Sequence, residues 1–279
     1  MGLAPQPAAL EAVKIQQPGA IVGEIARARG RASVRFRLIF FATWIIVVGA
    51  LAIAFLATGK IHPDFLAEWT PFILGGVPVT IFVSICSITI AVIFALAGAL
   101  GRLSRTAPIY ALATLYVSLV RGTPLIVQII FVYLALPEFG VVLDPLLGGI
   151  LTLAFNYGAY MTEIFRAGIQ AIPRGQVEAA QSLAMPEALI MRRVILPQAI
   201  RIVIPAVGNE FIAMIKDSSL VSFVTIQELF WRASTVGSRN FRSFETLLIA
   251  ALVYWFLTIA FSFVQERLEQ RMAESDRRL

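Results

Sequence analysis

The chain has 279 residues, of which 58% are hydrophobic and only 14% charged, with a mean hydropathy of +0.82 and a net charge of +6. Soluble domains carry about a quarter of their residues as charges, so this composition predicts an integral membrane protein. Cys86 is the only cysteine and His62 the only histidine, which excludes a disulfide scaffold and clustered metal ligands. Positive charge in such a chain is typical of cytoplasmic loops rather than of nucleic-acid binding.

Uncharged stretches predict the membrane spans, because a helix needs about 20 residues to cross a hydrocarbon core of about 30 Å. In chain order these stretches are 38–57, 71–101, 107–137 (interrupted only by Arg121), 145–162 and 247–264. A sixth and weaker candidate, 202–226, contains Glu210, Lys216 and Asp217. Charges within a membrane usually face a bundle interior or a cavity. We therefore favour an inner, pore-side helix over an interfacial one.

Basic residues predict the orientation, because Lys and Arg are enriched in cytoplasmic loops. Residues 1–37 form a basic arm before the first span, which places the N-terminus in the cytoplasm, and the basic tail after the last span places the C-terminus there too. One loop departs from the pattern, since Arg232, Arg239 and Arg242 lie outside if 202–226 spans the membrane. Either this loop binds something acidic or the charge rule is noisy here.

The longest cytoplasmic connection, 168–201, is too long for a simple link between spans. Pro173 and Gly175 interrupt the incoming helix, and a short helix is expected over 176–185. Pro186 suits the first turn of a second short helix running through Arg192, which Leu196-Pro197 is expected to end. Composition alone leaves open whether this segment contacts a partner or only covers the membrane surface.

The run Glu178-Ala179-Ala180, followed by Ile195-Leu196-Pro197, resembles the EAA loop of bacterial ABC-importer permeases. In that family the loop forms coupling helices that dock into a groove of the ATPase subunit. The family usually has a glycine shortly after the glutamate, where this chain has Ala184. The resemblance implies a set of ATPase-coupling residues: Glu178, Ala179, Ala180, Ala184, Met185, Pro186, Arg192, Leu196 and Pro197.

Three further runs between about residues 75 and 268 resemble the signatures of polar amino-acid permeases. They are Arg121-Gly122-Thr123-Pro124-Leu125 with Val127-Gln128, the run from Tyr160 to Gln170, and the run from Leu196 to Leu220 with its Gly208-Asn209-Glu210-Phe211 and Lys216-Asp217-Ser218-Ser219-Leu220. The resemblance implies candidates for the substrate path: Tyr160, Glu163, Arg121, Gln128, Asn209, Glu210, Lys216, Asp217 and Ser218.

Each charged candidate has a structural alternative. Glu163 and Arg166 are three residues apart and can form an ion pair that ends a span, or Glu163 can face the path and meet a cationic group. Arg121, beside Gly122 and Pro124, is expected at a helix break, where it bonds freed carbonyls or a partner helix, or binds a substrate carboxylate. Glu210 and Asp217 share a helix side, and Lys216 is expected to point about 100° away from Asp217. We interpret these three residues as subunit or gate contacts rather than as ligand contacts.

The resemblance implies an all-α membrane protein with the ABC type I importer permease fold, a five-helix core plus one extra N-terminal helix, and about six spans. The corresponding parts are the arm at 1–37, the extra helix at 38–60, the permease domain at 71–268 with its EAA loop at about 172–201, and the tail at 269–279. The implied function is the permease subunit of an ATP-driven, binding-protein-dependent importer of polar amino acids in the bacterial inner membrane.

The implied partners are ABC ATPase subunits, a second permease subunit, a periplasmic solute-binding protein, a polar or charged amino acid and the lipid bilayer. The sequence has no phosphate-binding G-x-x-x-x-G-K-[ST] loop, so ATP hydrolysis must come from a separate subunit, and no cofactor is expected. The alternatives are a self-sufficient ion-coupled carrier or channel that uses Glu163, Glu210 and Asp217, and a membrane-embedded enzyme, for which no catalytic constellation is present.

Overall fold

A computed structural model describes residues 18–276, with side chains from 34 to 272, and this part is helical with no strand. The chain forms two compact units, Met1–Ile61 and His62–Leu279. In the first unit, α1 (Pro18–Ala57) is one uninterrupted helix. From Pro18 on, the predicted basic arm is therefore the beginning of the same helix that supplies the first span, Val34–Ala57. The first 17 residues of the arm lie outside the described part.

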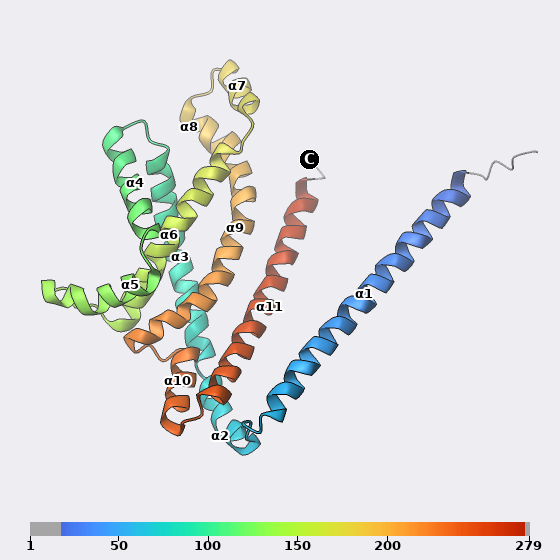
Figure 1. The fold of residues 1–279 in the computed structure, drawn as a ribbon. Helices are drawn as coiled ribbons and strands as arrows, with labels where there is room; N and C mark the ends of the chain where they lie inside the picture. Colours follow the sequence, from blue (N-terminus) through green and yellow to red (C-terminus); the bar gives the residue numbers. More distant parts are fainter. Residues whose placement is uncertain (1–17, 277–279) are drawn as a thin grey trace, which may run out of the picture. The chain divides into compact units, whose positions relative to one another are not determined.

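The second unit contains all the other helices (Figure 1). In chain order they are α2 (Pro63–Leu74), α3 (Val77–Arg102), α4 (Ala107–Arg121), α5 (Leu125–Ile130), the π-helix η1 (Phe131–Ala135), the 3₁₀-helix η2 (Leu136–Phe139), α6 (Pro145–Gln170), α7 (Arg174–Ser182), α8 (Glu187–Ile190), the π-helix η3 (Met191–Ile195), α9 (Leu196–Asp217), the 3₁₀-helix η4 (Ser218–Val224), α10 (Leu229–Asn240) and α11 (Ser243–Asp276). Figure 1 shows α7 and α8 at one end of this unit and α2 and α10 at the other.

Length and apolar composition single out three spans within 18–276: Val34–Ala57, Pro63–Arg102 and Ser243–Met272. A fourth span is added if Ala107–Arg121 and Leu125–Phe139, which meet at a bend of 103°, count as one broken span. α6 and α9 have 26 and 22 residues, long enough to cross a bilayer, yet they are too polar to be identified as spans by apolar composition. Such polarity is expected of helices that face the interior of a bundle.

The seam between α3 and α6 forms the centre of the second unit. Small residues bring the two helices close, as is common between membrane helices. A Cβ atom added to Gly98 would collide with the Thr162 side chain, and one added to Gly158 would lie 2.5 Å from the Phe94 Cβ. The buried alanines Ala91, Ala95 and Ala154 lie in the same core with Met161 and Met214. Gly98 and Gly158 therefore allow a close approach of α3 and α6.

The chain breaks between α4 and α5, as the Arg121-Gly122 and Pro124 pattern predicts. We call residues 121–125 the elbow, and the axes of the flanking helices differ there by 103°. The Gln128 side-chain amide, rather than Arg121, satisfies carbonyls that the break frees. Its nitrogen lies 2.8 Å from the Val120 carbonyl oxygen and 3.2 Å from that of Thr123. A polar side chain thus replaces the missing helical hydrogen bonds within a broken span.

The prediction that Leu196-Pro197 ends a short helix is wrong. α8, η3 and α9 follow one another without a gap, and Pro197 lies in the first turn of α9. Proline lacks a backbone N–H and cannot complete the regular helical ladder. The π-helical turn η3 directly before it provides a local change of register, so the chain continues from the cytoplasmic segment into α9.

At the opposite end, α10 begins on a fully buried carboxylate, Glu228. Its oxygens accept hydrogen bonds from the Trp231 backbone N–H at 2.7 Å, from the Tyr254 hydroxyl at 2.5 Å and from the Thr80 hydroxyl at 3.2 Å. α3, α10 and α11 are thereby connected through one side chain. Glu228 belongs to none of the motifs described above.

Candidate functional site

A cavity of about 610 Å³ lies where the elbow, α6 and α9 meet. Its charged lining consists of one guanidinium, from Arg121, and two carboxylates, from Glu210 and Asp217. Asn156, Tyr157 and Tyr160 of α6 and the elbow residues 122–125 complete the lining. Both signs of charge and several hydroxyl and amide groups therefore border one space within the bundle.

Specific contacts hold these groups in place. The Tyr157 hydroxyl donates a hydrogen bond of 2.8 Å to the Asp217 carboxylate, which connects α6 to the end of α9. The Arg121 guanidinium lies 5.1 Å from the centre of the Tyr160 ring, within the range of a cation–π contact. The Asn156 amide donates to the Gln128 side-chain oxygen at 3.1 Å, which connects the cavity wall to the elbow. The arrangement can pair a cation with carboxylates and an anion with a guanidinium.

The remaining path candidates do not line this cavity. Gln128 acts behind its wall at the elbow, and Lys216 and Asn209 are exposed on α9. The buried Ser218 hydroxyl donates to the Ile215 carbonyl oxygen at 2.7 Å. The expected separation of Lys216 from Asp217 around the helix thus agrees with the structure, and a role for these residues in the path stays a prediction.

Glu163 belongs to an ion cluster nearer the α7 end of α6. Arg166 donates to one Glu163 oxygen at 2.6 and 2.9 Å, and Arg102 donates to the other at 3.3 Å. Arg102 also donates to the Thr114 hydroxyl at 2.7 Å, so the cluster connects α3, α4 and α6. The structural alternative of an ion pair is therefore realised, and a direct contact between Glu163 and substrate stays a prediction.

Sequence reasoning missed Asn156 and Tyr157, which lie within a stretch interpreted only as an uncharged span. A helical signal was present, because residues one turn apart share a face. Asn156 and Tyr157 precede the candidate Tyr160 by four and three residues, so all three lie on one side of α6.

The EAA-like segment folds into α7 and α8, which project from one end of the unit (Figure 1). Glu178 and Ala179 are exposed on α7, whereas Ala180 is buried. Leu183, directly after α7, exposes 78% of its surface. Among the described residues the Glu178 carboxylate has no ion-pair partner. This end of the unit thus presents an apolar side chain and a carboxylate at its surface.

α7 ends in a Schellman motif, in which the residue that follows the C-cap is left-handed and is usually glycine. The C-cap here is Leu183. The Met185 N–H donates to the Ala180 carbonyl at 3.2 Å and the Ala184 N–H to that of Gln181 at 2.8 Å. Ala184 occupies the left-handed position with φ of 55°. Alanine thus occupies a position that usually requires glycine, at a cost of about 1 kcal/mol for the unfavourable conformation.

Replacing Ala184 by glycine is expected to stabilise the protein by up to about 1 kcal/mol, because glycine adopts positive φ without strain. The measurement is the thermal midpoint of the purified protein in detergent. Ala188→Gly, within α8, is the matched control and should lower stability by about 1 kcal/mol, since glycine disfavours a helix interior. Equal shifts for both variants would contradict the strain at Ala184.

The apolar helices and the charged cavity define a membrane protein with several spans. The family of binding-protein-dependent transport system inner membrane components matches residues 87–274. The chain is 40% identical over 203 residues to the L-cystine transport system permease protein TcyB of Bacillus subtilis (strain 168), covering 72% of this chain and 87% of that protein. It is 35% identical over 207 residues to the arginine transport system permease protein ArtQ of the same organism, covering 74% and 94%.

Chains in solved ABC transporters are also similar to this chain. An amino acid ABC transporter with histidines has a chain with a TM-score of 0.71 and 40% identity, covering 76% of this chain and 100% of that one. The inward-facing MetNI methionine ABC transporter, at 18% identity and a TM-score of 0.63, shares the fold. The chain belongs to the binding-protein-dependent transport system inner membrane component family. It is a multi-pass inner-membrane permease component of an amino-acid ABC transporter, with the type I importer fold.

Proposed function

We propose that this permease conducts polar or charged amino acids in an ATP-driven, binding-protein-dependent importer. The observation that carries the proposal is the cavity in which Arg121, Glu210 and Asp217 border one space inside a polar part of the bundle. Charges within a membrane protein are costly to keep and usually serve transport. An amino acid brings one carboxylate and one ammonium, and both find a partner of opposite charge here.

The proposed orientation of the substrate follows from the charges. The Arg121 guanidinium can bind the α-carboxylate, since arginine forms strong, directional hydrogen bonds with carboxylates. Glu210 and Asp217 are then left for the α-ammonium and for a cationic or polar side chain. With two carboxylates against one guanidinium, the cavity favours a substrate that carries net positive charge.

Coupling to ATP is proposed to occur through α7 and α8. Their exposed surface, with Glu178 and the apolar Leu183, suits the groove of an ATPase subunit, which the resemblance to the EAA loop implies. Because the chain lacks a phosphate-binding loop, a separate subunit would hydrolyse ATP. α8 continues through η3 into α9, so a movement of the segment would reach Glu210 and Asp217 along one helix.

A second permease subunit, identical or related, would complete the path on the open side of the cavity. With α7 and α8 in the cytoplasm, α10, at the opposite end of the same unit, would face outward (Figure 1). The basic residues of the arm and of the tail are the support for placing both termini in the cytoplasm. The solute-binding protein would then approach α10 and the turn that follows it.

The turn after α10 supports such docking. Phe241 is left-handed with φ of 55° and exposes 97% of its surface. Neither feature helps folding, because a bulky residue at positive φ is strained and an exposed ring buries nothing. Arg239 is exposed two residues before Phe241, and aromatic and arginine residues are typical anchors of protein interfaces. Arg242 instead lies 3.6 Å from the Glu245 carboxylate and stacks over the Phe65 ring. The binding protein would present an acidic surface here, which also accounts for Arg239 on the outer side, whereas Arg232 donates to the Phe72 and Gln227 carbonyl oxygens.

Replacing Phe241 by glycine is expected to reduce binding-protein-stimulated ATP hydrolysis at least fivefold, while stabilising the permease by about 1 kcal/mol through relief of strain. Phe139→Gly is the control for a ring that is also exposed, on η2. Stimulated and basal ATPase rates in proteoliposomes, together with the thermal midpoint, provide the measurement. Unchanged stimulation would refute the docking role.

The proposed function is tested by reconstituting the chain with its ATPase and binding-protein partners in proteoliposomes. Polar amino acids are expected to stimulate ATP hydrolysis, and uptake should stop when the ATPase is omitted. Uptake by the permease alone, driven by an ion gradient, would instead support the ion-coupled carrier that uses Glu210 and Asp217.

A further inference from the structure

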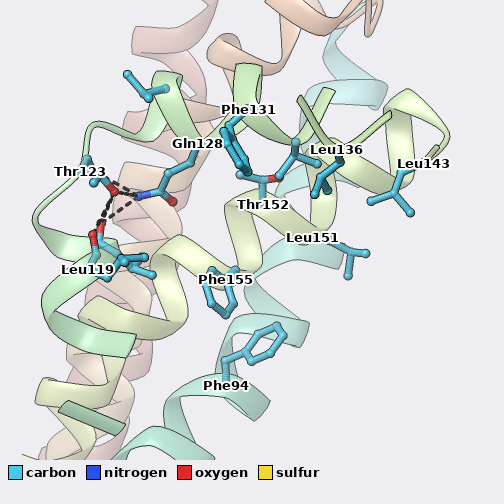
Figure 2. Close-up of a pocket in the computed structure, with 13 residues that line it drawn as sticks. Phe94, Leu119, Thr123, Gln128, Phe131, Leu136, Leu143, Leu151, Thr152 and Phe155 are labelled. Atoms are coloured by element: carbon cyan, nitrogen blue, oxygen red, sulfur yellow. Dashed lines mark hydrogen bonds between the residues drawn. The ribbon is translucent and has the colours of Figure 1, made fainter. Parts of the chain in front are cut away.

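Two further cavities lie among α3, α4, the segment from α5 to η2, and α6. The larger, about 580 Å³, lies beside the elbow (Figure 2). The smaller, about 280 Å³, lies between α3 and α4 and reaches Gly101, close to the loop that joins them. Phe94 and Phe155 line both, so the two cavities adjoin and form one groove, called here the acyl groove.

The lining of the acyl groove needs no hydrogen bonds from a bound molecule. Its polar side chains are already bonded within the protein: the Tyr116 hydroxyl donates to the Phe155 carbonyl at 2.7 Å, that of Thr152 to the Gly148 carbonyl at 2.7 Å, and the Gln128 amide to the Val120 carbonyl at 2.8 Å. Figure 2 shows the bonded amide of Gln128 beside Thr123 and the rings of Phe131, Phe155 and Phe94 around the space. A polar ligand would lose its hydration without compensation here, whereas an apolar one gains.

The groove lies at membrane depth. α4 and the segment from α5 to η2 are together apolar enough for one broken span or a re-entrant loop, both of which lie within the membrane, and the groove follows α4 and this segment. Its lining includes apolar side chains that also face outward, with exposures of 69% for Leu112, 59% for Leu119 and 54% for Phe131. The groove is therefore continuous with the apolar outer surface of the span, which contacts acyl chains in a bilayer.

Charge complementarity indicates the position of a headgroup. The loop that joins α3 to α4 carries Arg105, whose side chain is 89% exposed and reaches Glu187 at 3.2 Å. An ion pair between side chains as exposed as these contributes little, so the Arg105 guanidinium can also bind an anionic headgroup. An acyl chain whose headgroup lies beside this loop would enter between Gly101 and Ile109 and extend past Phe94 and Phe155 toward the elbow.

We propose that the acyl groove binds one acyl chain of an anionic phospholipid, with the headgroup at the α3–α4 loop and the chain end behind the elbow. Thr123 lines both this groove and the charged cavity. The chain end would thus support, from behind, the same backbone that borders the substrate candidate site. The inference concerns the groove alone and stands whether or not the charged cavity binds amino acids.

The experiment uses the full chain in nanodiscs that contain phosphatidylglycerol with a diazirine at the end of one acyl chain. Irradiation and peptide mapping by mass spectrometry locate the labelled residues. Labelling of the groove residues at α5–η1 and at Phe155 is expected to exceed, at least fivefold, that of Phe256 and Phe263, which are exposed on α11 at 69% and 54%. Comparable labelling of both sets would show ordinary contact with bulk lipid and overturn the proposal.

A variant that fills the groove provides a second test of the proposal. Val132 lines the larger cavity and is half-buried, and Val132→Trp should reduce groove labelling at least threefold while leaving α11 labelling unchanged. Phe256→Trp, on the exposed face of α11, is the matched control and should leave the groove signal intact. If the unaltered protein shows α11 labelling but none in the groove, another protein segment covers it, and the proposal fails without any variant being needed.

Discussion

Replacing Asp217 by asparagine is expected to reduce uptake of cationic amino acids at least tenfold, with a smaller loss for neutral ones. The substitution removes the charge but keeps the shape of the side chain. The remaining amide oxygen can still accept the hydrogen bond from the Tyr157 hydroxyl, which is 2.8 Å long in the native protein. Hydrogen bonds to charged groups contribute about 1.5–3 kcal/mol, and about 1.4 kcal/mol corresponds to a tenfold change in binding. Uptake in proteoliposomes, with the complete transporter and labelled substrates, measures the effect.

Two controls separate charge from structure. Asp64→Asn removes an exposed carboxylate at the start of α2, outside the cavity, and should leave uptake unchanged. Tyr157→Phe removes the hydroxyl that holds Asp217 and should reduce both substrate classes alike. Equal losses for cationic and neutral substrates in Asp217→Asn would assign Asp217 to the structure and not to substrate binding.

Replacing Glu178 by lysine is expected to abolish uptake and to weaken copurification of the ATPase, with membrane insertion unaffected. The Glu178 side chain is exposed on α7, so the substitution disturbs no internal packing. Reversing the charge would oppose a partner surface that is complementary to the native carboxylate, and like charges across an interface cost several kcal/mol. Pull-down of the ATPase and uptake, measured on the same preparation, give the result.

Glu138→Lys, on η2, tests whether any reversal of an exposed charge has this effect. It should leave ATPase association unchanged. Normal transport and full copurification of the ATPase with Glu178→Lys would remove the coupling role from α7, even if the permease itself is confirmed as a transporter subunit.

Much of the fold could be predicted from local patterns. Uncharged runs located α1, α3 and α11, and Gly122 with Pro124 located the elbow, because these signals depend on the chain itself. The course of the chain at Pro197 could not be predicted this way. Whether a proline ends a helix or is accommodated by a π-helical turn depends on packing that fixes both sides, and the sequence pattern is the same in both cases.

The candidate site could be predicted in part for a similar reason. Arg121, Tyr160, Glu210 and Asp217 were all named from the sequence, and the structure brings them to one cavity. The surroundings of Glu163 could not be predicted in full. One of its two partners, Arg102 of α3, is 61 residues earlier in the chain, and the sequence does not show that the two residues meet. Helical spacing reveals neighbours one turn apart, such as Arg166, but contacts between helices require the packed bundle.

The glycine contacts between α3 and α6 have a consequence for how the permease changes shape. Two helices whose backbones interlock at Gly98 and Gly158 have no room to slide past each other, so this pair forms a stiff spine. The compliant points are those where the regular ladder is interrupted: the elbow, the π-helical turn η3 and the 3₁₀ turn η4. We therefore expect opening and closing of the proposed path to be a rotation of rigid pieces about these three points, two of which, η3 and η4, flank α9.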